Sequence, residues 1–173
     1  MPTVNIYDIS NYAAGVTYSK DDIVKSASSY FYSLVDNNIG NTPSTTSAFW
    51  GGYVVDVDGI TRPNFFWSPS YGNNVDQTPL VNTITFGDGY SQTIKKEINN
   101  NLLRISIGFN DISLARASAI SHFLHIRAGA ETFLFTPPPP YAKRKRFKCK
   151  SWNLVDNFWN NFSISAQFEE VPV

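Results

Sequence analysis

The sequence predicts a mainly β protein: a C-terminal β-sandwich or split barrel with one packed α-helix, preceded by a small three-stranded, aromatic-rich β module. Three observations predict this fold. Apolar and polar residues alternate along several short C-terminal segments, which is the pattern of half-buried strands. A single segment has the longer apolar period of an amphipathic helix. The chain of 173 residues contains 13 Phe, 9 Tyr and 4 Trp, and aromatic residues favour strands.

The N-terminal module is predicted to cover residues 1–58. Residues 16–19 and 22–25 are expected to pair across a tight connection, and the aromatic segment 29–35 is expected to form a third strand. A dense cluster of turn-forming residues follows these strands. Residues 59–63 are predicted to be a linker, because an Asp-Gly turn leads into them and a proline ends them.

The C-terminal domain at 64–173 has the clearer strand pattern. Residues 80–86 and 90–94 are expected to form a hairpin around the Gly-Asp-Gly turn at 87–89, because glycine adopts positive φ without a Cβ clash. Apolar and small or polar residues alternate strictly over 103–109, which predicts a strand with one buried face.

One helix is predicted after this strand. Asp111 or Ser113 is expected to cap its N-terminus, and Gly129 is expected to end it. Its apolar residues fall on one stripe with Phe123 at the flank, so the helix should lie over a sheet. The residues of the stripe are Leu114, Ala117, Ile120, Leu124 and Ala128.

Three more strands are expected near the C-terminus, at 131–135, 147–154 and 162–168. Four consecutive prolines at 137–140 cannot donate ladder hydrogen bonds and are expected to form a stiff spacer. The domain then has about six strands and one helix, which favours a sandwich or barrel with the helix on one face.

The sequence lacks the motifs of the common enzyme classes and suggests neither catalytic residues nor a cofactor. His122 and His125 are three residues apart but have no carboxylate one turn away, so they are expected to be a solvated or interfacial surface pair. Asp56 and Asp58 begin like a calcium loop, but no glutamate closes it, and a plain turn is favoured. Cys149 is expected to be a small residue facing the core.

The charge balance gives little indication of a charged partner. With 14 basic and 14 acidic residues the formal net charge is zero, so no specific nucleic acid is expected. No apolar run approaches the roughly 20 residues needed to cross a bilayer, and no membrane contact or secretory signal is expected. One basic cluster is either a contact with a polyanion or acidic partner, or a solvated hairpin tip. It comprises Lys143, Arg144, Lys145 and Arg146, with Lys148 and Lys150 nearby.

Aromatic side chains of the N-terminal module form a candidate contact surface for a glycan or a fibre. Flat rings stack on sugar faces, and the candidates are Tyr12, Tyr32 and Trp50. A small module must also use aromatic residues in its core. Trp50 is expected to be structural for that reason, and Tyr12 and Tyr32 are expected to be more exposed.

The C-terminal domain resembles the minor tail protein M family of long-tailed bacteriophages. The order and spacing of its motifs extend over nearly the whole domain. The matching segments are Phe65-Phe66-Trp67-Ser68-Pro69-Ser70-Tyr71-Gly72, Phe86-Gly87-Asp88-Gly89-Tyr90-Ser91-Gln92, Ile98-Asn99-Asn100, Phe123-Leu124 in the helix, Phe133-Leu134-Phe135-Thr136-Pro137-Pro138, Phe147-Lys148-Cys149-Lys150-Ser151-Trp152, and Ile164-Ser165-Ala166-Gln167-Phe168-Glu169-Glu170-Val171.

This resemblance implies a non-enzymatic component of the virion tail tip, or baseplate, related to distal tail proteins. Such a protein forms a homo-oligomeric ring, usually hexameric, and contacts the tail tube protein, the tail hub and other tail-tip proteins, the tape measure protein and in some virions the tail fibres. It is assembled in the cytoplasm of the bacterial host. The residues expected at contacts between subunits or with partners are Gly87, Asp88, Tyr90, Lys143, Arg144, Lys145 and Arg146.

The N-terminal module resembles the small chitin-binding-like modules of bacterial chitinases and phage tail proteins. This similarity implies a carbohydrate-binding-like β fold, and it supports an alternative function as an adhesion protein that attaches the virion to host surface glycans. The Trp-Trp pair of strong chitin binders is absent at 30–32. The similar residues are Tyr12, Gly15, Tyr18, Asp22, Val24, Tyr30, Asn38, Gly40, Pro43 and Trp50.

Overall fold

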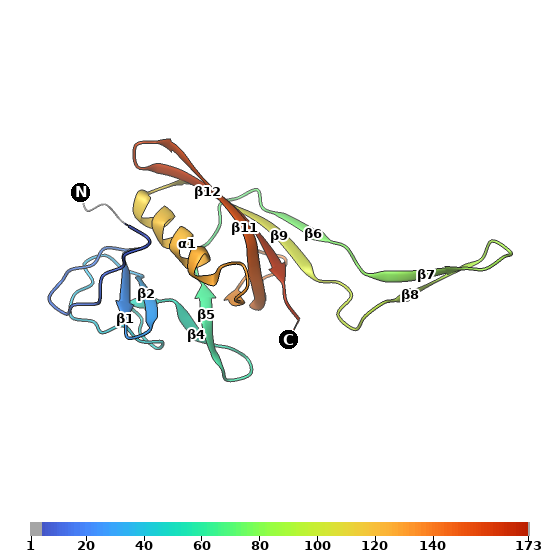
Figure 1. Ribbon diagram of the computed structural model, residues 1–173, viewed down its shortest axis with the longest axis horizontal. Coiled ribbons are helices and arrows are strands. Elements are labelled where there is room, and N and C mark those ends of the chain that lie inside the picture. Colours follow the sequence, from blue (N-terminus) through green and yellow to red (C-terminus); the bar gives the residue numbers. More distant parts are fainter. Residues whose placement is uncertain (1–4, 173) are drawn as a thin grey trace.

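The computed structural model describes residues 5–172 and confirms a mainly β fold (Figure 1). Its strands form three sheets, and a 14-residue helix lies between two of them. The N-terminal sheet has three strands, the central sheet has seven, and a separate hairpin has two. The strands are β1 (Ile23–Ser26), β2 (Ser29–Ser33), β3 (Trp50–Gly51), β4 (Tyr53–Val55), β5 (Thr61–Phe65), β6 (Asn74–Gln77), β7 (Val81–Thr85), β8 (Ser91–Lys95), β9 (Leu103–Ile112), β10 (Phe133–Phe135), β11 (Lys145–Phe158) and β12 (Asn161–Glu170).

The N-terminal sheet has the order β1-β2-β3, so the predicted three-stranded module is present. The predicted strand at 16–19 is wrong. Within it, Tyr18 makes only an isolated bridge with Asn38, and each donates its backbone N–H to the other's carbonyl at 2.9 Å. The first strand pairs instead with the second, from Ile23 opposite Tyr32 to Ser26 opposite Ser29.

The central sheet has the strand order β4-β5-β10-β11-β12-β9-β6. Among the described residues its two edge strands, β4 and β6, do not pair with each other, so the sheet stays open and does not close into a barrel. The alternation predicted for β9 is confirmed, because the residues from Leu103 to Phe109 alternate between buried and more exposed positions. Strand β11 runs for 14 residues and is longer than the predicted segment 147–154.

The helix α1 (Leu114–Arg127) begins and ends as its sequence predicts. Ser113 caps it and accepts a hydrogen bond from the backbone N–H of Arg116, while Asp111 lies outside it. Ala128 adopts the left-handed conformation and Gly129 follows at φ 71°, so the chain leaves the helix there. The predicted stripe is buried at Ala117, Ile120 and Leu124, with Phe123, although Leu114 is exposed.

Helix α1 is covered on both sides. Its apolar stripe faces the central sheet, and its opposite side faces the N-terminal module (Figure 1). Tyr32 of β2 is fully buried in the same core cluster as Phe123. The indole N–H of Trp67 donates a hydrogen bond of 2.9 Å to the carboxylate of Asp21, and this bond also joins the two parts of the chain.

The predicted linker at 59–63 is part of regular structure. Strand β5 pairs antiparallel with β4 and parallel with β10, where Phe65 lies opposite Phe135. Both β4 and β5 therefore belong to the central sheet, although β4 falls inside the segment assigned to the N-terminal module. The Asp-Gly turn joins two paired strands, as such turns commonly do.

Candidate functional surfaces

The β7–β8 hairpin, here called the arm, projects away from the rest of the molecule (Figure 1). Its turn and pairing are those predicted, with Thr85 opposite Ser91 and Gly89 at φ 82°. All five residues of each strand are exposed, so neither face of the hairpin is buried against the rest of the described chain. The C-terminal domain is organised around the central sheet and α1, and the arm lies outside its core.

The arm has two unlike faces. Cross-strand partners share a face, and residues two apart along a strand share it too. Thr83 lies opposite Thr93, and their hydroxyls are 3.2 Å apart on the polar face. The other face, here called the apolar face, carries four apolar side chains that are 43–74% exposed, with Asn82 and Gln92 opposite two of them. The four are Ile84, Phe86, Tyr90 and Ile94.

A second hairpin, at the joined ends of β11 and β12, also carries exposed apolar residues. Its tip extends beyond the last residue pair between β12 and β9, Phe162 with Ile112. Phe158 and Trp159 at the tip are 66% and 78% exposed. An exposed aromatic tip on each of two projections is typical of a surface that other subunits cover.

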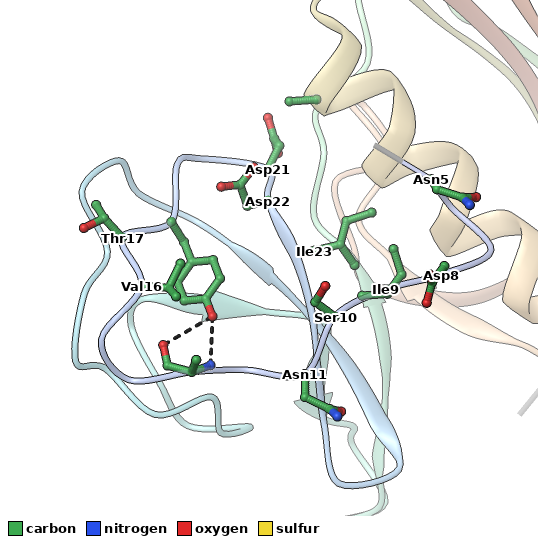
Figure 2. Close-up of a pocket in the computed structure, with 13 residues that line it drawn as sticks. Asn5, Asp8, Ile9, Ser10, Asn11, Val16, Thr17, Asp21, Asp22 and Ile23 are labelled. Carbon is green, nitrogen blue, oxygen red and sulfur yellow. Dashed lines mark hydrogen bonds between the residues drawn. The ribbon is translucent and has the colours of Figure 1, made fainter. Parts of the chain in front are cut away.

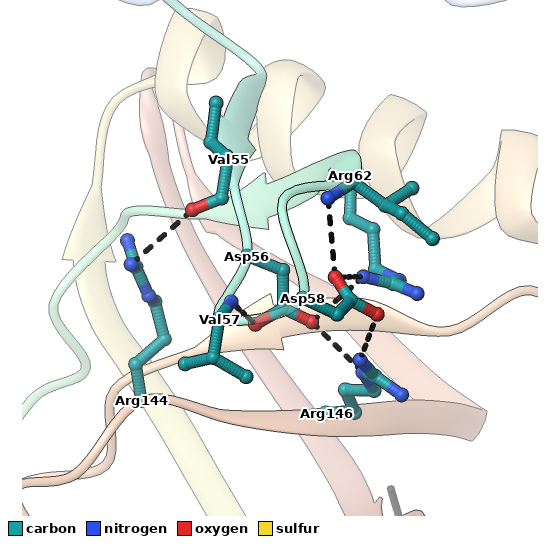
Figure 3. Close-up of polar contacts among 8 residues, drawn as sticks. Val55, Asp56, Val57, Asp58, Arg62, Arg144 and Arg146 are labelled. Atoms are coloured by element: carbon teal, nitrogen blue, oxygen red, sulfur yellow. Dashed lines mark hydrogen bonds and ion pairs between the residues drawn. The ribbon is translucent and has the colours of Figure 1, made fainter.

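Asp56 and Asp58 hold the β4–β5 turn against β11 (Figure 3). Each carboxylate pairs with the guanidinium of Arg62 and with that of Arg146, at N–O distances from 2.6 to 2.9 Å. The hydrogen bond from Arg62 is the main cause that lowers the pKa of Asp58. Burial raises the pKa of Asp56, but hydrogen bonds from the Val57 backbone and Arg146 outweigh it, so this pKa is also lowered. Two acidic and two basic groups thus neutralise one another.

These ion pairs divide the basic cluster. Arg146 is engaged with the two aspartates, and Lys145 pairs with Glu170 at 2.8 Å. Both residues also lie inside β11, so the expected solvated hairpin tip is wrong for them, and their charges are already paired within the chain. Lys143 and Arg144 are exposed and make no ion pair with any residue of 5–172, although Arg144 reaches the Val55 carbonyl at 3.4 Å. They are the part of the cluster available to a partner.

The structure corrects the expected exposure of the N-terminal aromatic residues. Tyr32 is fully buried because it belongs to the core under α1. Trp50 is buried as expected for a structural residue, and its indole N–H donates to the Asn41 carbonyl at 2.7 Å. Tyr12 remains partly exposed and contacts the rings of Tyr18 and Trp50. A glycan or fibre contact stays a prediction for Tyr12.

A hollow of about 470 Å³ lies beside β1, between the N-terminal segment and the start of α1 (Figure 2). Its lining includes Asp8, Asp21 and Asp22. The Asp22 carboxylate accepts a 2.7 Å hydrogen bond from the Ser19 backbone, and burial raises its pKa, helped by the nearby Asp21 and Asp36. Since Asp21 bonds Trp67 and Asp22 bonds Ser19, these two carboxylates support the fold of the module.

The predicted surface position of the histidine pair is wrong for His122. Only 1% of this residue is exposed, and its Nδ1 shares a 3.0 Å hydrogen bond with the hydroxyl of Tyr32. Sequence pattern placed it opposite the apolar stripe, and the N-terminal module covers that side of the helix. His125 is exposed and lies against the ring of Tyr7. Cys149 is buried, which confirms its predicted place in the core.

The buried His122 should make the protein sensitive to mild acid. Burial, assisted by the charges of Arg127 and His125, lowers its pKa to about 4, whereas a histidine in the unfolded chain titrates near 6.5. Between these values the unfolded state binds more protons, so stability decreases as pH falls. From pH 7 to pH 5 we expect a loss of about 2 kcal/mol from this group, measured by denaturant unfolding. His122→Gln should lack this contribution, and an equal loss in both proteins would contradict the assignment.

Within residues 5–172, no group of three or more His, Cys, Asp or Glu side chains is arranged to hold a metal ion. In the same range no helix has the length and apolar character needed to cross a membrane.

Comparison with known proteins gives a match over the C-terminal domain. The family described as phage minor tail protein matches residues 63–172. Tail tip protein M of Escherichia phage lambda is 32% identical over 107 residues, which cover 62% of this chain and 95% of that protein. The family match begins within β5 and includes the central sheet from there on, α1 and the arm, and the N-terminal sheet precedes it.

Proposed function

Because the chain belongs to the phage minor tail protein family, and is thus a structural component of a phage tail, we propose that it forms a ring at the tail tip. In this role it joins the tail tube to the receptor-binding tip as a homo-oligomer, and a hexamer is the stoichiometry proposed. It acts by assembly and not by catalysis. Its neighbours are the tail tube protein, the tail hub and other tip proteins, and the tape measure protein.

One observation carries this proposal: the arm exposes an apolar face that nothing else in the described chain covers. An isolated two-stranded hairpin is at best marginally stable in water, so the arm requires another surface against which to order. A monomer rarely gathers four large apolar side chains on one exposed face, and such faces mark protein–protein contacts. A repeated subunit supplies a covering surface to every copy at once.

Two other features support the same role. Charged residues make up only 16% of the chain, below the usual quarter, as expected of a surface that is extensively covered. The tip with Phe158 and Trp159 projects from a different part of the molecule and offers a contact for a neighbouring layer of the tail. The N-terminal module, which covers α1, lies outside the family match and is proposed to decorate or stabilise the ring.

Imaging of the intact tail tests the proposal. We expect density for this chain as a closed ring around the tail axis at the tip, with a symmetry order that gives the copy number. A labelled N-terminal module should appear once per subunit. A single copy per virion, or a position along the tail tube away from the tip, would overturn the ring role.

A further inference from the structure

Besides the arm, the structure has a largely apolar groove beside β5 and β10 of the central sheet. It lies between β5 with the residues after it and the proline segment after β10, and has a volume of about 610 Å³. Phe66 and Trp67 stack at 4.1 Å on one wall, and Pro138 lies on the other. Tyr71 stands fully exposed at its margin. Flat rings and prolines make this groove suited to an aromatic ligand.

The margin of the groove is positively charged. Arg144 lines it and Lys143 is its neighbour in sequence; both are exposed. The nearby Asp56 and Asp58 do not offset these charges, because Arg62 and Arg146 already pair with them. The groove therefore favours an occupant that is aromatic and carries a negative charge.

The tip of the arm has this composition. From Leu80 to Ile94 the only charged residue in the sequence is Asp88, which occupies the turn. Phe86 and Tyr90 flank it on the apolar face, 50% and 74% exposed. Two aromatic rings with one carboxylate between them match the apolar walls and basic margin of the groove.

The tip of the arm does not reach the groove of its own chain. The proline segment of the groove comes near the base of the arm, where the Tyr141 hydroxyl donates a 3.3 Å hydrogen bond to the Gln77 side chain. From that base the arm projects outward, and every residue of β7 and β8 is exposed (Figure 1). A contact between arm tip and groove is therefore one between copies, with each subunit giving its arm and receiving that of the next. Repeated contacts of this head-to-tail kind close into a ring when the rotation permits.

We propose that the arm tip of one copy of this chain docks into the groove of the next. Phe86 and Tyr90 lie against Phe66 and Pro138, and Asp88 pairs with Arg144 and Lys143. The proposal rests on the ring role proposed above and names the surfaces that build the ring.

A charge swap tests the pairing in assembling tails. Full-length variants Asp88→Lys and Arg144→Glu, each supplied as the sole copy of this protein, should reduce its incorporation into purified tails by about tenfold or more. The double variant should restore incorporation, since each interface regains an opposite pair. Thr85→Lys, on the polar face of the arm, is the control and should assemble normally. Normal incorporation of both single variants would overturn the docking.

Cross-linking gives a second readout. Gly87→Cys and Tyr71→Cys place cysteines at exposed positions on the arm tip and groove and keep both rings of the arm tip. Cys149 does not compete, because it is buried and burial raises its pKa to about 11. In tails that carry both substitutions, a short bismaleimide should produce dimers and higher multimers, and each single variant should produce none. If imaging shows a ring but no cross-linked multimers form, the docking proposal is overturned and the ring role stands. Absence of the wild-type chain from the tail tip overturns both proposals.

Discussion

Replacing residues 79–101 by Asn-Gly should abolish assembly of this protein into tails while leaving its fold intact. Gln77 and Leu103 are directly paired at the base of the arm, so the next pair outward, Thr78 and Leu102, can be closed by a two-residue type I′ turn. The arm adds no side chain to the main core, and we expect the free energy of unfolding to stay within about 1 kcal/mol. Denaturant unfolding and incorporation into purified tails measure the two effects.

Unfolding and incorporation distinguish loss of the fold from loss of assembly. A folded protein that is absent from tails is the expected outcome, because the surface proposed to join neighbouring subunits has been removed. Thr85→Lys, which alters the polar face of an intact arm, should behave as the wild type in both assays. A truncated chain that still enters tails in normal amount would contradict a role for the arm in assembly.

Phe65→Ala should be among the most destabilising single substitutions in the chain. Phe65 is 2% exposed, and its ring centroid lies 5.1–5.9 Å from those of six other aromatic residues. Removing this ring leaves a cavity at the point where β5, β10, β12 and α1 meet. The expected loss is about 3–5 kcal/mol, a large part of the roughly 5–15 kcal/mol that stabilises a typical domain. Denaturant unfolding measures it.

Phe158→Ala is the matched control, because it removes the same side chain from a position that is 66% exposed. The free energy of unfolding should then change by no more than about 0.5 kcal/mol. Similar losses in both variants would mean that Phe65 does not occupy the centre of the core.

Sequence patterns within short segments were sufficient to predict most of the strands, the arm hairpin and the helix. Alternation predicted β9 and β12, the Gly-Asp-Gly turn predicted the arm hairpin, and Ser113 and Gly129 predicted the ends of α1. Each of these features depends on residues that are close in sequence. The same pattern cannot show that the arm is uncovered, because its alternation is that of a strand with one buried face.

The contacts that the sequence did not predict join residues that are far apart in the chain. Tyr32 and His122 are 90 residues apart, as are Asp56 and Arg146. Helical period assigned His122 to a surface, and the missing glutamate of a calcium loop assigned Asp56 to a plain turn. Neither residue's partner is close to it in sequence. Two sequence features could have indicated these contacts. One is a histidine on a helix with no partner nearby in sequence, and the other is an Asp-x-Asp turn in a chain that also contains a cluster of basic residues.

The burial of Tyr32 beneath α1 limits how this protein can be altered by recombination. If the N-terminal module were a separate appendage, its removal would expose no core residues of the remaining domain, and the module could be exchanged between phages by recombination. Here the aromatic ring of Tyr32, from the N-terminal sheet, fills part of the main core, and the Asp21 carboxylate accepts the hydrogen bond of the Trp67 indole. A recombination junction at residue 63 would remove both Tyr32 and Asp21. An exchange there would therefore require compensating changes at His122 and Trp67, the residues that they contact.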